Sequence, residues 1–268
     1  MVCRACEANS LADAARAAAR CDNARWQPIW HKKKYAMNAR IFALVAAAGT
    51  GTRLGEALPK QYLDLNGRPM IYHALAALAE VSRIEKIFVV LSPVDSHWSQ
   101  LMAHLVPPRV ACLTVGGASR AASVANGLAA IRTDAGLDDW IMVHDAARPC
   151  IRAALIEQFI DELENDPIGG LLALPLADTI KLADDELRVE KTLSRENIWR
   201  AQTPQMFRFG LLQPALRDFV EATDESQAIE SIGHQPKLVM GDSANLKVTY
   251  ATDMKLAEML LNAAATKV

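Results

Sequence analysis

A small-residue loop followed by two cations is the segment of this sequence best suited to chemistry. The loop reads A-A-A-G-T-G-T-R-L-G over residues 46–55 and directly follows the apolar run 41–45, which is typical of a buried parallel strand. Backbone N–H groups in such a loop bind phosphate oxygens. Arg53 and Lys60 add two positive charges. This combination suits a triphosphate and the charge that develops during phosphoryl transfer.

Two common phosphate-binding motifs fit this loop poorly. A dinucleotide fingerprint needs a third glycine where Leu54 stands, an uninterrupted helix where Pro59 stands, and a carboxylate near residues 90–92, which is absent. The loop also lacks the Gly-Lys-Ser/Thr ending of a Walker A motif. A glycine-rich turn that binds nothing is the remaining structural alternative.

A second small-residue segment, residues 116–123, reads G-G-A-S-R-A-A-S. Its glycines allow a close backbone approach, and the hydroxyl of Ser123 can both donate and accept hydrogen bonds. These properties suit recognition of a planar base. The alternative is a plain strand-to-helix turn in which Ser119 caps the helix.

A third cluster, V-H-D-A-A-R-P, covers residues 143–149. Asp145, just past an apolar strand, can hold a ribose hydroxyl or a magnesium-bound water. Arg148 is near enough to orient that carboxylate or to meet phosphate, and a structural Asp–Arg pair is the alternative. We interpret His144 as a packing or hydrogen-bonding residue. Lys247, ahead of the last helical segment, carries little information alone because isolated lysines are usually solvated.

Composition favours a small-molecule partner. The 268 residues carry 29 basic and 31 acidic side chains, so no excess of positive charge is available for a nucleic-acid backbone. No apolar stretch is long enough to span a bilayer. The five cysteines show no disulfide spacing, and a zinc site from Cys3, Cys6 and Cys21 with His31 is weakly supported. We therefore expect a cytoplasmic protein that binds neither nucleic acid nor membrane.

Apolar runs alternate with helical patterns from residue 41 onward, which predicts an α/β fold. We expect a mostly parallel, Rossmann-like sheet with helices on both faces and ligands bound beyond the carboxyl ends of the strands. The expected strands are 41–47, 87–92, 111–115, 140–144, 170–176 and 237–240. The expected helices are 70–81, 97–105, 118–131, 153–163, 225–232 and 252–264.

Two segments stand outside this alternation. Residues 177–189 form an inserted hairpin with a turn at 183–186, which is either a surface decoration or an arm that grips another subunit. Residues 1–39 are rich in Ala, Arg and Lys and carry no alternating apolar pattern. We expect 1–36 to be a disordered extension or to precede the true start at Met37, and 40–268 to be the functional domain, with the arm at about 177–203.

Taken together, the motifs resemble the 2-C-methyl-D-erythritol 4-phosphate cytidylyltransferase family. The likeness begins near Arg40 and continues almost to the C-terminus. It rests on the two small-residue segments, on V-H-D-A-A-R-P, and on further motifs that occur in the family's order. These are P-K-Q-Y (59–62), D-T-I-K (178–181), I-W-R-A-Q-T-P-Q (198–205), T-D-E (223–225) and N-L-K-V-T (245–249).

The resemblance implies transfer of CMP from CTP to methylerythritol phosphate with Mg²⁺ and release of pyrophosphate. Arg53 and Lys60 match the transition-state stabilisers. Arg195 and Lys247 match the residues that position the acceptor phosphate, with Thr179 nearby. It implies that the arm, which carries Thr179 and Arg195, crosses to the partner in a homodimer. The residues that match the surroundings of cytosine, ribose and metal are Ala46, Ala47, Ala48, Gly49, Gly117, Ala118, Ser123 and Asp145; we add Arg148 to this nucleotide set.

Two positions depart from the family pattern, and three other functions compete. Many members have Pro in place of Ala46 and Asp in place of Ala118, which removes a side-chain acceptor near the base. A ribitol 5-phosphate cytidylyltransferase, or another sugar-phosphate nucleotidyltransferase, keeps the chemistry and changes the acceptor. A nicotinamide-dependent oxidoreductase and a nucleotide sensor without activity are the alternatives from other classes.

The N-terminal segment gives a first prediction. Deleting residues 1–36 leaves catalytic activity intact, because the expected functional domain begins after them. Steady-state kinetics of the shortened and full-length chains test this, and a large loss of activity on deletion would contradict it.

Overall fold

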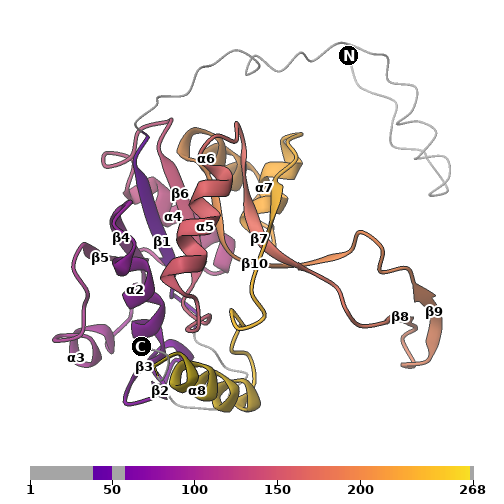
Figure 1. Ribbon diagram of the computed structural model, residues 1–268. Helices are drawn as coiled ribbons and strands as arrows, with labels where there is room; N and C mark the ends of the chain where they lie inside the picture. The colour runs from indigo at the N-terminus through magenta and orange to yellow at the C-terminus, as the bar shows by residue number, and fades with distance from the viewer. Residues whose placement is uncertain (1–38, 50–57, 266–268) are drawn as a thin grey trace, which may run out of the picture. The chain divides into compact units, whose positions relative to one another are not determined.

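The protein is built around one seven-stranded sheet. The computed structural model (Figure 1) describes residues 39–49 and 58–265. In the described part, the strand order is β11-β7-β10-β6-β1-β4-β5. The strands are β1 Ile41–Ala46, β4 Ile84–Val90, β5 Val110–Leu113, β6 Trp140–Asp145, β7 Gly169–Pro175, β10 Trp199–Arg208 and β11 Lys237–Met240. All neighbours are parallel except β10, which is antiparallel to β6 and to β7.

The mostly parallel sheet predicted from the sequence is confirmed, but β10 is absent from the prediction. Its central residues Gln202, Thr203 and Gln205 are polar and flank Pro204, so no apolar run indicates a strand. The arm therefore ends earlier than predicted, because Trp199 already pairs with Pro175 of β7.

Helices cover both faces of the sheet, as predicted. They are α2 Met70–Glu80, α3 Trp98–Leu101, α4 Arg120–Ala130, α5 Ala153–Leu163, α6 Phe209–Asp218, α7 Glu225–Ser231 and α8 Ala251–Ala265, with a 3-10 turn η2 at Lys60–Tyr62. Helix α3 is shorter than the predicted 97–105. Helix α6 was not predicted, because Gly210 and Pro214 interrupt its apolar pattern.

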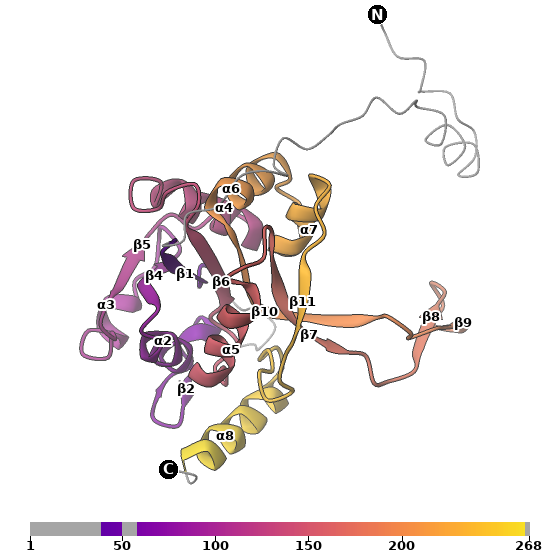
Figure 2. The same cartoon turned by 45° about the horizontal axis from the view of Figure 1, so that its top comes forward.

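Side-chain alternation along the strands assigns each helix to a face. In β1, Ala43 and Val45 join a buried cluster that includes Phe159 of α5, together with residues of α2. Phe42 and Leu44 point the other way, into a cluster with residues of α4, α6 and α7. Figures 1 and 2 show these two helical layers on opposite sides of the sheet. A strand buried on both faces is the reason that 41–46 is uniformly apolar.

A third cluster attaches α8 to one end of the sheet. Ala257 of α8 packs with Val248 and with Leu65 of the small β2–β3 sheet (β2 Asp64–Leu65, β3 Arg68–Pro69). The Val248 N–H donates to the carbonyl of Ala147 at 2.8 Å. The segment that carries Lys247 is thereby fixed beside the carboxyl end of β6.

The predicted hairpin consists of β8 Ile180–Ala183 and β9 Val189–Leu193, which pair antiparallel with each other. It leaves the sheet between β7 and β10, and Figures 1 and 2 show it projecting away from the helical layers. Most of its residues are exposed, including Leu182 and Val189. We call residues 177–198 the hairpin arm. Across the described residues, no helix combines the length and apolarity that a membrane crossing requires.

Candidate active site

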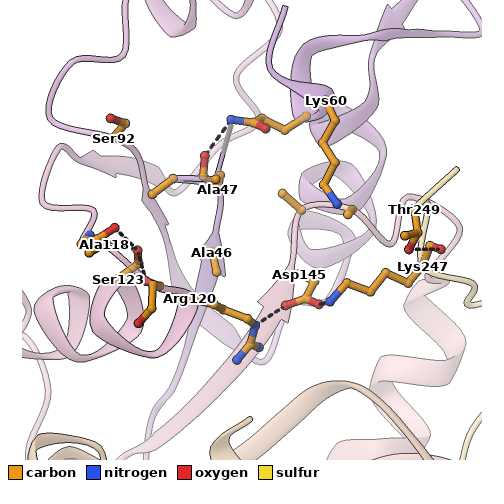
Figure 3. A pocket seen from close by; sticks show the side chains of 17 residues that line it. Ala46, Ala47, Lys60, Ser92, Ala118, Arg120, Ser123, Asp145, Lys247 and Thr249 are labelled. Carbon is orange, nitrogen blue, oxygen red and sulfur yellow. Dashed lines mark hydrogen bonds and ion pairs between the residues drawn. The ribbon is translucent and has the colours of Figure 1, made fainter. Parts of the chain in front are cut away.

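A cavity of about 600 Å³ lies beyond the carboxyl ends of the central strands. It brings together ten of the residues proposed from the sequence, as Figure 3 shows for those it labels. These are Ala46, Ala47, Ala48, Gly49, Lys60, Gly117, Ala118, Ser123, Asp145 and Lys247. Its position agrees with the rule that ligands of open α/β sheets bind at this edge.

The strand register and Gly116 place the loops that form the cavity walls next to one another. Ala46 of β1 lies directly beside Asp145 of β6. The loop after β5 closes on the loop after β1 at Gly116, where a Cβ would lie 2.4 Å from the Cβ of Ala48 and 2.8 Å from the carbonyl oxygen of Leu91. No larger residue fits at position 116 without moving that backbone.

The hydroxyl of Ser123 mainly stabilises the second loop. It accepts from the N–H of Gly117 at 3.0 Å and donates to the carbonyl of Ser119 at 2.8 Å. Ser119 caps α4, since its side chain accepts from the N–H of Ala122. The plain turn that we considered from the sequence is therefore present, and its backbone forms one wall of the cavity.

Asp145 is the charged centre of the site. Its Oδ1 accepts from Nε of Arg120 at 2.7 Å, and its Oδ2 pairs with Nζ of Lys247 at 2.7 Å (Figure 3). Burial alone would raise the pKa of this carboxyl, but the charges of Arg120 and Lys247 outweigh burial and hold the pKa well below its usual range. Asp145 is therefore ionised at neutral pH.

Arg120 is a cavity residue to which the sequence reasoning gave no role. Besides Asp145 it binds Glu225, with Nη1 to Oε1 at 2.8 Å and Nη2 to Oε2 at 3.1 Å. Glu225 is completely buried behind it. Burial opposes the charged form of Arg120, but the two carboxylates more than compensate and raise its pKa. Arg120 and Glu225 occur in the family motifs G-G-x-x-R and T-D-E, but the sequence does not indicate that they pair, because they are 105 residues apart.

Lys60 reaches the cavity from another segment of the chain. It lies in the short turn η2, and its Nζ donates to the carbonyl of Val248 at 3.3 Å. The neighbouring Gln61 donates from Nε2 to the carbonyl of Ala47 at 2.8 Å, which ties this turn to the loop after β1. Among the described lining residues, three cations and one carboxylate therefore face the same space. This excess of positive charge attracts a polyanion.

Four proposed residues do not join this group. Arg53 lies outside the described residues, as do the residues of the weakly supported zinc site. Thr179 and Arg195 lie on the exposed hairpin arm, where Arg195 donates to the carbonyl of Ala177. Arg148 is buried, and its guanidinium donates to the carbonyls of Asn245 and Ala201. Arg148 thus supports the segment that carries Lys247, its described hydrogen bonds do not include one to Asp145, and contact with phosphate stays a prediction.

His144 is a buried hydrogen-bonding residue, as expected. Its Nε2 lies 3.3 Å from the carbonyl of Arg148, and its Nδ1 lies 3.1 Å from the hydroxyl of Thr203. The carbonyl of Arg148 can only accept, so the proton of the neutral ring sits on Nε2 and the hydroxyl of Thr203 donates to Nδ1. The same hydroxyl accepts from the N–H of Asp145 at 3.1 Å. Burial lowers the pKa of His144 to about 4. This network fixes the backbone of Asp145.

The side chains available as metal ligands limit how a metal ion would bind in the cavity. Among the residues that the structure describes, no group of three or more His, Cys, Asp or Glu side chains is placed to hold one. Asp145 is the single carboxylate in the described cavity lining. A hard cation such as Mg²⁺ binds through one or two carboxylates together with substrate phosphates and water. The site fits that mode and no all-protein cage.

Comparison with known proteins agrees with this geometry. A family model described as 2-C-methyl-D-erythritol 4-phosphate cytidylyltransferase matches residues 41–263. A protein with that name from Dechloromonas aromatica (strain RCB) is 53% identical over 224 residues, covering 84% of this chain and 98% of its own length. A crystal structure of a 4-diphosphocytidyl-2C-methyl-D-erythritol synthase is 34% identical with a TM-score of 0.74, covering 83% of this chain and 99% of that one. A 2-C-methyl-D-erythritol 4-phosphate cytidylyltransferase from Francisella tularensis is 31% identical with a TM-score of 0.71, at 83% and 100% coverage.

The buried imidazole gives a pH prediction. The folded protein binds a proton at His144 only near pH 4, whereas the unfolded chain binds it near pH 6.5. The unfolded state is therefore favoured as pH falls from 6.5 to 4, by up to about 3 kcal/mol in total. We expect NMR of ¹⁵N-histidine-labelled protein to show His144 as the neutral Nε2–H tautomer at pH 5. In the His144→Gln variant, the unfolding free energy should depend less on pH in this window. A His144 ring that titrates near 6.5 would contradict the assignment.

Proposed function

The chain belongs to the 2-C-methyl-D-erythritol 4-phosphate cytidylyltransferase family, and from this we infer that it transfers CMP from CTP to 2-C-methyl-D-erythritol 4-phosphate. The products are pyrophosphate and 4-diphosphocytidyl-2-C-methyl-D-erythritol, a precursor in isoprenoid synthesis. The observation that carries the inference is a cavity lined by Lys60, Arg120 and Lys247, of which Arg120 and Lys247 pair with the carboxylate of Asp145. Such a cavity suits a nucleoside triphosphate and a second phosphate ester.

The reaction needs no protein nucleophile. An oxygen of the acceptor phosphate attacks the α-phosphorus of CTP in line, and pyrophosphate leaves. Catalysis then depends on positioning and on stabilising charge. We assign Lys60, together with Arg53, to the triphosphate, because Lys60 lines the cavity and is not one of the two cations that pair with Asp145 in the described contacts. We assign Lys247 to the acceptor phosphate, because phosphate can exchange for the carboxylate oxygen that Lys247 now contacts.

The nucleotide would lie along the two small-residue loops. Backbone groups of Ala46 to Gly49 and of Gly117 and Ala118 are the proposed contacts for cytosine and ribose, since Ser123 is engaged by its own loop. Ala118 offers no side-chain acceptor, so base recognition there would be made by the backbone. The backbone at these positions is accessible because small side chains leave the cavity open.

Mg²⁺ is the proposed cofactor. When bound with CTP it would neutralise negative charge on the phosphates, and Asp145 would hold it on the protein side in this proposal. We also propose a cytoplasmic location, in keeping with the free thiols of Cys112 and Cys150.

We propose that the hairpin arm completes the site of a second subunit in a homodimer. Thr179 and Arg195, which the family resemblance assigns to the acceptor, lie on the exposed arm and do not line this chain's cavity. The arm pairs only with itself among the described elements and exposes Leu182, Val189 and Leu193. Exposed apolar side chains on a projecting hairpin suit burial against another copy.

The first test follows pyrophosphate release in the presence of CTP and Mg²⁺. We expect turnover with methylerythritol phosphate, much less with ribitol 5-phosphate, and little when ATP, GTP or UTP replaces CTP. The Lys60→Ala variant should lower kcat on the order of a hundredfold or more, because a fixed charge at the transition state is lost. Lys86→Ala is the matched control, since Lys86 pairs with Asp134 far from the cavity. A Lys60→Ala enzyme within a few-fold of wild type would refute the role of Lys60, and preference for ribitol 5-phosphate would change the acceptor.

The second test asks whether the arm works in trans. Lys60→Ala disables the cavity and Arg195→Ala disables the arm, so each homodimer should be nearly inactive. After mixing and subunit exchange, a heterodimer holds one site with an intact cavity and an intact arm. We expect recovery of about a quarter of the wild-type activity, as random exchange places half of the chains in such dimers. Failure to recover activity, in a mixture shown by tagged-subunit pull-down to contain heterodimers, would show that each arm does not serve its partner.

A further inference from the structure

The guanidinium of Arg120 binds two carboxylates, Glu225 through two hydrogen bonds and Asp145 through one. Both of its terminal nitrogens bind Glu225, at 2.8 Å and 3.1 Å. Only Nε reaches Asp145, at 2.7 Å and on a single oxygen. Arginine and carboxylate pair most strongly through two parallel hydrogen bonds, and Glu225 occupies that mode.

Because Arg120 offers Asp145 only Nε, the two oxygens of Asp145 bind different cations. Oδ1 accepts from Arg120, and Oδ2 remains turned toward Lys247 at 2.7 Å. Without Glu225, Asp145 would be the remaining anionic partner that the structure gives Arg120. Arg120 would then be free to take both oxygens of Asp145 in a bidentate pair, which would compete with Lys247.

We propose that Glu225 is a positioning residue that engages both terminal nitrogens of Arg120, so that only Nε binds Asp145 and the second oxygen of Asp145 stays directed into the cavity. Glu225 does not act on substrate directly. It is completely buried and is not among the residues that line the cavity, so its influence passes through Arg120. The inference rests on the proposed function, in which Asp145 serves the nucleotide and Lys247 serves the acceptor.

The surroundings of Glu225 make it a rigid support. It is the first residue of α7, after the cap Asp224, whose carboxylate accepts from Gln227 N–H and from Nε2 of Gln205. Gln205 in turn accepts from the N–H of Ser226 at 2.8 Å. Helix α7 is thereby tied to β10, which pairs with β6, the strand that ends in Asp145. The two carboxylates that share Arg120 thus belong to connected elements.

The experiment compares the variants Glu225→Gln, Glu225→Asp, Arg120→Met and the double variant Glu225→Gln/Arg120→Met. Glutamine keeps the shape but presents N–H groups to the donors of Arg120, and aspartate keeps the charge but is too short to reach both nitrogens. We expect either change at 225 to lower kcat/KM for CTP by about ten- to a hundredfold, because the misplacement is small. The double variant should be no worse than Arg120→Met alone, since Glu225 acts through Arg120.

Asp139→Asn is the control for a merely structural effect. Asp139 is a nearly buried carboxylate that pairs with Arg40 at the other end of β6, away from the cavity. We expect it to lower the melting temperature as Glu225→Gln does, but to leave kcat/KM for CTP unchanged. If Glu225→Gln fails to fold, the kcat/KM of Glu225→Asp tests the proposal instead, because aspartate retains the buried charge.

Three results would overturn the proposal. The first is a folded Glu225→Gln or Glu225→Asp enzyme with the kcat/KM of wild type. The second is a double variant whose kcat/KM falls by the product of the losses caused by the two single changes. The third is a loss of kcat/KM in Asp139→Asn equal to that in Glu225→Gln. A wild-type enzyme that releases no pyrophosphate from CTP and methylerythritol phosphate would instead refute the proposed function itself.

Discussion

The buried carboxylate of Asp145 is the constraint around which the rest of the site is arranged. An ionised group at this depth is tolerated only when opposite charges and hydrogen bonds surround it. Arg120 and Lys247 supply the charges, and the network of Thr203 and His144 fixes the backbone. These partners come from α4, from the segment before α8, from β10 and from β6. Four separated parts of the chain must therefore be in place before the site exists.

The same arrangement fixes the positions of the cations before substrate arrives. Lys247 and Arg120 are paired with one carboxylate, and Lys60 donates to the carbonyl of Val248, the residue after Lys247. A triphosphate thus meets charges whose positions are already set, and less reorganisation is needed as negative charge moves toward the leaving group. The small residues of the two loops let backbone N–H groups approach the same space. Charge and backbone donors act together because strand register places Ala46 beside Asp145.

The sequence predicted the features that are encoded by neighbouring residues and missed those that depend on contacts between distant segments. Uniformly apolar strands such as 41–46 and regular helices such as 153–163 are local patterns, and both were predicted well. The loop of residues 46–49 and Asp145 were predicted to share a site because strand ends meet at one edge of a parallel sheet, whereas Lys247 was added to that site by the family resemblance. The polar strand β10 has no local signature. The pairing of Arg120 with Glu225 and the burial of Arg148 depend on contacts between distant segments, which spacing along the chain does not reveal.

Buried hydrogen bonds also link the root of the hairpin arm to the segment that carries Lys247. Gln202 of β10 donates to the carbonyls of Asp242 and Asn245, and Nδ2 of Asn245 donates to the carbonyl of Thr203. The buried guanidinium of Arg148 spans the same two segments. Buried polar groups are costly to separate, so these bonds hold the two segments together. The base of the hairpin arm and the segment of Lys247 are therefore joined by one hydrogen-bonded network within the subunit.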